Sequence, residues 1–234
     1  MLPLIRGVVL TDYAWDARGH EYISKVPLDR QVVFQMRLSE SASALLEAIN
    51  KGTTDQNIGV AMMRVVLVLS DNENEATDWF EVARRLAPGS YEPYNARRNA
   101  LLPRWGGHDE DLLAFGREAF ARQQWGSRAP LELVEAHQWI AKGPPEKTGY
   151  MARPEVCADI KSVYEALLAK YPEARTDRSR YARRLMTCKA WSESDKQFRR
   201  LGDRPALSVF GGQEKFDAER ALVAKRLAAT VASR

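Results

Sequence analysis

Cysteine and histidine, the side chains that most often build metal centres, are scarce in this sequence of 234 residues. The two cysteines, Cys157 and Cys188, form no C-x-x-C pair, which excludes a zinc ribbon and a disulfide-rich scaffold. We expect both to be buried, unreactive thiols, in keeping with a reduced, cytoplasmic setting. The three histidines, His20, His108 and His137, belong to no H-E-x-x-H or E-x-x-H pair, so we predict no metal site.

Motifs for nucleotide binding and for nucleophilic catalysis are also missing. The sequence has no phosphate-binding loop, no G-x-G-x-x-G and no G-x-S-x-G. We therefore predict no cofactor and no catalytic residue, and interpret the protein as non-enzymatic. An enzyme with an unfamiliar site is the alternative, and His137 paired with a carboxylate of strongly shifted pKa would be its mark.

Long apolar runs are absent as well. The opening segment, MLPLIRGVVL, is too short and too interrupted by Arg6 and Gly7 for the core of a secretory signal. No run approaches the length of a membrane span, so we expect no membrane association.

Apolar residues recur with helical spacing along most of the chain. This predicts an all-α protein with about ten helices. A strand over 64–69 is the alternative for one valine-rich stretch, but the length of its apolar pattern favours a helix. Residues 1–28 are predicted to form an irregular N-terminal arm, followed by a single helical-repeat domain over 29–234. The predicted helices cover about 29–51, 55–69, 75–87, 91–102, 109–120, 128–142, 154–171, 177–189, 192–201 and 213–232.

Residues 91–120 lie at the centre of this pattern. Their sequence predicts two helices separated by a tight break. Pro103 disfavours helical backbone at the residue before it, and Gly106-Gly107 provide a flexible turn. The segments WFEVARRLAP and VYEALLAKYP, at 79–88 and 163–172, share an aromatic residue, a glutamate and a final proline. This similarity indicates an internal helical repeat.

Three groups of motifs resemble a known family. Tyr91-x-x-Tyr94 is followed by LLPRWGG and LLAFGREA, Trp15-Asp16-Ala17-Arg18-Gly19 lies upstream, and Ala190-Trp191 precedes FRRLGD. Together they resemble a group of bacterial tetratricopeptide-like proteins known mainly as a domain of unknown function. The resemblance implies antiparallel helix pairs stacked as a right-handed α-solenoid, and it implies a fold rather than a reaction.

In tetratricopeptide repeats, the partner peptide lies in a concave groove lined by the first helix of each pair. The resemblance therefore implies a scaffold or adaptor that binds a protein or peptide partner in such a groove. Amide side chains there can clamp a peptide backbone, because they both donate and accept hydrogen bonds. The residues expected to contact the partner are Glu92, Asn95, Asn99, Arg104, Trp105, Ser179 and Lys189.

Positive charge is concentrated in one segment. Between positions 173 and 204 the chain has ten Lys or Arg residues and five Asp or Glu residues, whereas the net charge of the whole chain is +4. The alternative function is therefore a basic adaptor for nucleic acid or an acidic partner. Base-stacking aromatics are few there, which disfavours nucleic acid. The arginines expected to form this basic patch are Arg178, Arg180, Arg183 and Arg184.

Overall fold

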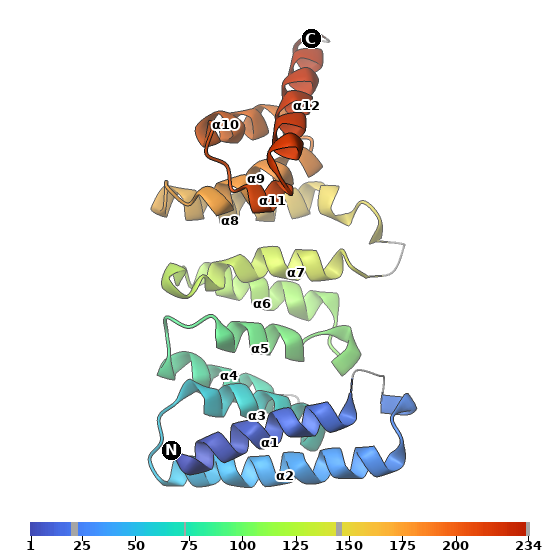
Figure 1. Cartoon of the computed structure of the whole chain (residues 1–234), viewed down its shortest axis with the longest axis vertical. Helices are drawn as coiled ribbons and strands as arrows, with labels where there is room; N and C mark the ends of the chain where they lie inside the picture. Colours follow the sequence, from blue (N-terminus) through green and yellow to red (C-terminus); the bar gives the residue numbers. More distant parts are fainter. Residues whose placement is uncertain (20–22, 73, 144–146, 233–234) are drawn as a thin grey trace. The chain divides into compact units, whose positions relative to one another are not determined.

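Helices form nearly all the regular structure of the chain (Figure 1). Twelve α-helices and several short 3₁₀ helices, and no strand, occur in the ranges that our computed structural model describes, which are 1–19, 23–72, 74–143 and 147–232. The all-α prediction is confirmed, and the valine-rich stretch at 64–69 is helical. No helix in these ranges combines the length and the hydropathy that crossing a bilayer requires.

The chain divides into two compact units, Met1–Glu132 and Leu133–Arg234, where we predicted one repeat domain over 29–234. In the first unit, α1 packs against α2 and α3, and α3 packs in turn against α4 and α5. The helices of this unit are α1 (Leu2–Arg18), α2 (Leu28–Asn50), α3 (Gln56–Leu69), α4 (Glu75–Leu86), α5 (Glu92–Ala100) and α6 (Asp109–Ala121). Its 3₁₀ turns are η1 (Ile23–Lys25), η2 (Pro103–Trp105), η3 (Trp125–Ser127) and η4 (Ala129–Leu131).

The N-terminal segment differs from the prediction. An irregular arm over 1–28 is wrong, because most of it is α1. The residues that α1 buries are mostly small or polar, so a search for periodic apolar residues misses the helix. They are Leu4, Gly7, Thr11 and Ala14.

Small residues bring α1 and α2 close together. A Cβ atom added to Gly7 would lie 2.6 Å from Cγ of Leu45. The hydroxyl of Ser41 donates to the carbonyl oxygen of Gly7 at 2.8 Å, and the hydroxyls of Thr11 and Ser41 are 2.7 Å apart. These buried polar groups are therefore paired with one another across the helix interface.

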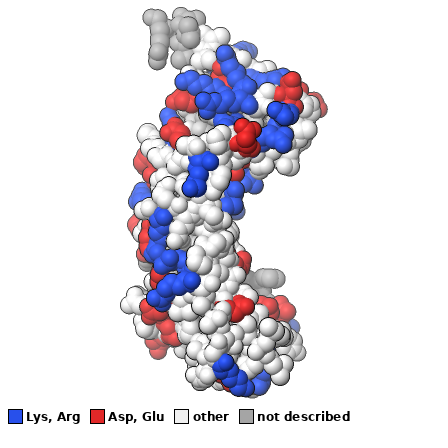
Figure 2. All heavy atoms as spheres, turned by 90° about the vertical axis from the view of Figure 1, so that its left-hand side faces the viewer, with Lys and Arg blue, Asp and Glu red and all other residues white. Residues whose placement is uncertain are grey.

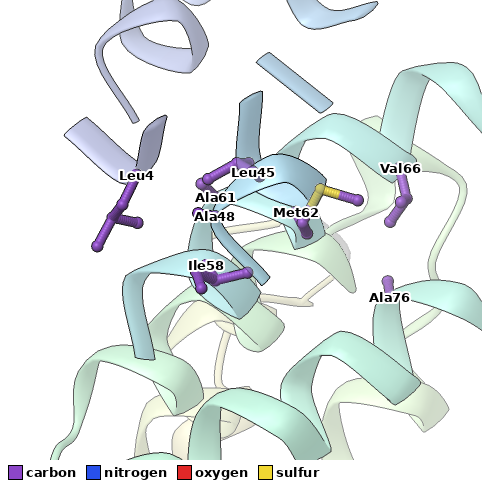
Figure 3. Close-up of a cluster of buried hydrophobic side chains, with 8 residues drawn as sticks. All are labelled: Leu4, Leu45, Ala48, Ile58, Ala61, Met62, Val66 and Ala76. Atoms are coloured by element: carbon purple, nitrogen blue, oxygen red, sulfur yellow. The ribbon is translucent and has the colours of Figure 1, made fainter. Parts of the chain in front are cut away.

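The core of the first unit surrounds α3, which the pattern predicts to be buried nearly all round. Seven of its fourteen residues are buried, but Leu69 is 41 % exposed, so the prediction holds for only part of the helix. Asp55 caps the helix as predicted, accepting the N–H of Asn57 at 2.8 Å. Figure 3 shows one cluster of buried side chains, contributed by α1 to α4: Leu4, Leu45, Ala48, Ile58, Ala61, Met62, Val66 and Ala76.

In the second unit, two pairs of antiparallel helices pack together, and a long final helix follows them. Its helix α9 packs against both α8 and α10, and α10 packs against α12. Three phenylalanines, Phe198, Phe210 and Phe216, meet in its core with ring centroids 5.0 to 5.8 Å apart. The elements are α7 (Glu132–Ile140), η6 (Tyr150–Ala152), α8 (Pro154–Lys170), α9 (Arg175–Thr187), α10 (Trp191–Leu201), α11 (Leu207–Phe210) and α12 (Gln213–Ala232).

The two cysteines form a disulfide, so the expectation of free thiols is wrong. Cys157 and Cys188 have Cα atoms 5.8 Å apart. Because α8 and α9 form an antiparallel hairpin, positions at equal distances from the turn lie opposite each other. Cys157 lies 13 residues before Lys170, the end of α8, and Cys188 lies 13 residues after Arg175, the start of α9. The disulfide therefore follows from the register of this hairpin. The number and spacing of the cysteines in the sequence do not reveal that register.

The contact between α3 and α4 gives a first prediction. A Cβ atom on Gly59 would lie 2.5 Å from the carbonyl oxygen of Trp79. We expect Gly59→Ala to lower the free energy of unfolding by about 1–2 kcal/mol, because the steric cost exceeds the gain in helix propensity. Chemical denaturation measures it. Gly89→Ala is the control, since its Cβ would meet open space, and equal stability of the two variants would contradict the close contact.

The disulfide gives a second prediction. Replacing both Cys157 and Cys188 by serine should lower the free energy of unfolding of the second unit by about 3 kcal/mol, because the open chain gains entropy when unfolded. Thermal unfolding with and without dithiothreitol tests this. The reductant should lower the melting temperature of the wild-type protein and leave that of the double variant unchanged. A wild-type protein insensitive to the reductant would argue against the bond.

Candidate functional site

Two motifs from distant parts of the sequence meet in the first unit. Trp15, near the end of α1, packs edge to face on Trp105 of η2, with 5.1 Å between the ring centroids. Trp15 also contacts Phe34 of α2, with 5.0 Å between the ring centroids. Pro103 begins η2, and Gly106 ends it in the left-handed conformation with φ of 87°. The tight break predicted from the sequence therefore presents Trp105 to α1.

Two guanidinium groups converge on Trp105. The Cζ atom of Arg18 lies 5.2 Å from the ring centroid of Trp105 and 5.5 Å from that of Trp15. The Cζ atom of Arg104 lies 5.5 Å from the Trp105 centroid. Both distances are within the range of cation–π attraction. We call these four residues, Trp15, Arg18, Arg104 and Trp105, the tryptophan–arginine cluster.

The charges in this cluster are unbalanced. Partial burial, and then the nearby positive charge of Arg104, lowers the pKa of Arg18. Arg18 donates to the carbonyl oxygen of Gly19 at 3.1 Å, but among the described residues neither it nor Arg104 has an ion pair. A third arginine, Arg64, approaches Trp15 at 5.9 Å and is neutralised by Asp12 at 2.5 Å.

The expected groove residues of α5 have different surroundings. Glu92 is exposed, whereas Asn95 and Asn99 are half-buried. The side-chain oxygen of Asn95 accepts a hydrogen bond from Arg98 at 2.5 Å. This oxygen already accepts a hydrogen bond within the fold, so Asn95 has less hydrogen-bonding capacity left for a peptide backbone.

Arg98 belongs to a buried ion pair that the sequence analysis missed. One of its terminal nitrogens donates to both carboxylate oxygens of Glu132, at 2.7 and 2.9 Å, and to the hydroxyl of Tyr91 at 3.0 Å. The side chain of Glu132 is wholly buried. Burial, together with the Glu132 carboxylate, raises the pKa of Tyr91 above its usual range. Spacing gives no signal for this pair, because its members are 34 residues apart.

Two predicted contact residues of the second unit are buried, so their expected exposure is wrong. The hydroxyl of Ser179 accepts the N–H of Ala206 at 3.1 Å. Arg178 donates to the side-chain oxygen of Gln197 at 2.8 Å and to the carbonyl oxygen of Pro172 at 2.6 Å. The physical reason is that α9 packs against both α8 and α10, which covers this part of the helix. Burial lowers the pKa of Arg178.

The rest of the predicted basic patch is partly neutralised. Arg180 lies 3.6 Å from Asp177, and Arg183 lies 3.0 Å from Glu219. Figure 2 shows Lys and Arg side chains gathered over the C-terminal part of the chain on the face drawn, with Asp and Glu among them. Arg184, the fourth arginine of the patch, is partly exposed, and Lys189, expected as a partner contact, is exposed.

His137 is paired with a carboxylate inside the second unit. One ring nitrogen lies 2.9 Å from the hydroxyl of Tyr150, and the other lies 3.1 Å from a carboxylate oxygen of Asp159. His137 is only 2 % exposed, so these contacts hold the ring in a closed interior. Sequence spacing gives no signal for either partner, because the three residues come from α7, η6 and α8. His20 lies outside the described residues.

Comparisons with protein-family models, curated proteins and solved structures found nothing that matches this chain. The resemblance to tetratricopeptide-like proteins therefore rests on the sequence motifs. Within the ranges that the structure describes, no group of three His, Cys, Asp or Glu side chains could hold a metal ion.

The buried ion pair gives a third prediction. Arg98→Met leaves the Glu132 carboxylate buried without the cation opposite it, so we expect the free energy of unfolding to fall by about 3–5 kcal/mol. In the double variant Arg98→Met/Glu132→Leu the buried charge is gone, and most of the loss should be recovered. Urea titrations of the single and double variants measure this coupling, with exposed Arg85→Met as the control. Purely additive losses would show that the pair is not coupled.

Proposed function

We propose that this chain is a non-enzymatic interaction scaffold that binds a protein or peptide partner. The observation that carries the proposal is the apolar outer face of α2. Leu28, Val32 and Met36 follow one another at intervals of four residues and are 76, 57 and 53 % exposed, and Leu46 continues the same face at 47 %. An extended apolar face on the surface is typical of a protein–protein contact.

This face of α2 also lacks charge along the whole helix. Positions spaced by three and four residues lie on one side of a helix, and the residues there are uncharged. The hydroxyls of Ser39 and Ser43 bond back to the carbonyl oxygens of Gln35 and Ser39, each at 3.0 Å, so a partner can cover them without leaving them unpaired. The residues of the face are Leu28, Gln31, Val32, Gln35, Met36, Ser39, Ala42, Ser43, Leu46, Ile49 and Asn50.

A tetratricopeptide-like stack with a concave groove is part of this proposal. Its support in the structure is that α3 packs against α4 and also against α5, as alternate helices do in arrays of helix pairs. Of the residues expected to line the groove in the first unit, Glu92 and Arg104 are exposed, and Asn99 and Trp105 are half-buried. We propose these four as partner contacts of the groove.

The disulfide bears on where the scaffold acts. The sequence led us to expect the cytoplasm, where thiols are kept reduced. A bond between Cys157 and Cys188 argues for an oxidising compartment instead, since most structural disulfides persist there.

The alternative of a basic adaptor for nucleic acid or an acidic partner has weaker support. Of its four arginines, Arg178 is buried, and Arg180 and Arg183 are paired with carboxylates. A nucleic-acid surface needs several cations free to meet phosphates. We therefore retain the protein partner.

A fourth prediction tests the α2 face. The tagged chain is crosslinked in its own cells, and its crosslinked proteins are quantified for the wild type and for Val32→Glu/Met36→Glu. We expect at least one protein to be depleted about tenfold in the variant, because two charges would be buried against an apolar partner. The matched control, Asn57→Glu/Arg85→Glu, changes two exposed positions elsewhere in the unit and should retain that protein.

Circular dichroism and melting temperature first establish that both double variants fold like the wild type. The proposal fails when the set of crosslinked proteins is the same for all three folded chains. Crosslinking only to a second copy of the chain, with loss in the α2 variant, would identify the partner as the chain itself.

A further inference from the structure

The tryptophan–arginine cluster holds two guanidinium groups against one indole ring. Arg18 and Arg104 both approach Trp105, and the positive charge of Arg104 disfavours that of Arg18. Neither guanidinium has an ion pair among the described residues. Two like charges held beside one aromatic ring cost free energy, and an anion bound between them would remove that cost.

Among the described residues, the acids of α1 do not supply this anion, and Glu21 lies outside the described residues. Asp16 is two residues from Arg18 on α1, and residues two apart on a helix face different sides. Asp12 is paired with Arg64. At η2, Arg104 is exposed and Trp105 is half-buried, so a ligand can reach both side chains.

We propose that the tryptophan–arginine cluster binds a peptide carboxylate, with Arg18 and Arg104 on the carboxylate and Trp105 against the neighbouring apolar side chain. A guanidinium presents a planar pair of N–H donors that matches the two oxygens of a carboxylate. The indole ring provides a flat apolar surface beside them. This site is separate from the α2 face but shares Arg104 and Trp105 with the proposed groove, so the inference rests on that part of the proposed function. Loss of binding at the α2 face would leave it untouched.

The exposed side of α1 and the first turn of α6 carry acids, which favours a single carboxylate over a polyanion. Asp12 and Asp16 lie on the exposed side of α1, and three more acids, Asp109, Glu110 and Asp111, open α6 only four residues after Trp105. A nucleic acid would bring several phosphates close to these carboxylates. A peptide with one carboxylate brings less negative charge toward them.

The carboxylate has two sources in a peptide, an acidic side chain and the C-terminus. Two probes distinguish them: Ac-Leu-Glu-Leu-NH₂, which has only the side-chain carboxylate, and Ac-Ala-Leu-Leu, which has only the terminal one. Ac-Leu-Gln-Leu-NH₂ has the same shape as the first probe but no charge. Inorganic phosphate serves as the competing anion.

A fifth prediction follows for nuclear magnetic resonance. The indole N–H signal of Trp105, assigned with Trp105→Phe, should shift on titration with at least one carboxylate probe. That probe should bind about tenfold more tightly than the glutamine peptide, because charge-assisted hydrogen bonds are lost with the charge. Binding should weaken about tenfold in Arg18→Gln/Arg104→Gln and stay unchanged in Arg6→Gln/Arg85→Gln, which removes two exposed charges of the same unit.

Unchanged signals of the other tryptophans establish that the variants are folded. Should the glutamine variant unfold, Arg18→Lys/Arg104→Lys replaces it, and binding should still weaken, because lysine keeps the charge but loses the planar fork. The inference is overturned by equal binding of the glutamate and glutamine peptides, by tighter binding of phosphate than of either carboxylate probe, or by no shift of Trp105 with any probe.

Discussion

The close packing of α1 on α2 decides what the first unit presents at its surface. Gly7, Thr11 and Ser41 let the two helices approach until side chains meet backbone. Since α1 then occupies the inner side of α2, the opposite side of α2 is left with an apolar, uncharged face. The same packing fixes the end of α1, and with it Trp15 and Arg18, beside η2. Both candidate surfaces of this unit therefore depend on one interface between small residues.

Arginine has two different roles in this unit, and the nearest carboxylate decides which. Arg98 is buried beside Glu132, whose negative charge offsets the cost of removing both groups from water. Arg18 is less buried and has another arginine as its charged neighbour. In the first arrangement the positive charge has a carboxylate opposite it within the fold. The second has no ion pair among the residues that the structure describes, and this difference separates a stabilising contact from a candidate binding site.

The sequence predicts most helices but few of the contacts between them. Helical spacing, the cap at Asp55 and the break at Pro103 act over a few residues, so pattern reasoning finds them. It misses α1 because that helix buries small and polar residues instead of an apolar stripe. The disulfide, the Arg98–Glu132 pair and the burial of Ser179 depend on the register between helices. For the same reason the motifs point to Trp105 and Arg104, but not to their contact with Arg18.

The two candidate surfaces would contribute to recognition in different ways. The α2 face offers area without charge, and burial of apolar area gives affinity with little discrimination between partners. The tryptophan–arginine cluster offers two guanidinium groups beside an indole ring, which discriminates by charge and shape. Both surfaces belong to one compact unit that α3 holds together. A partner that used both would therefore meet them at a fixed separation, and that separation would add to the selectivity of each.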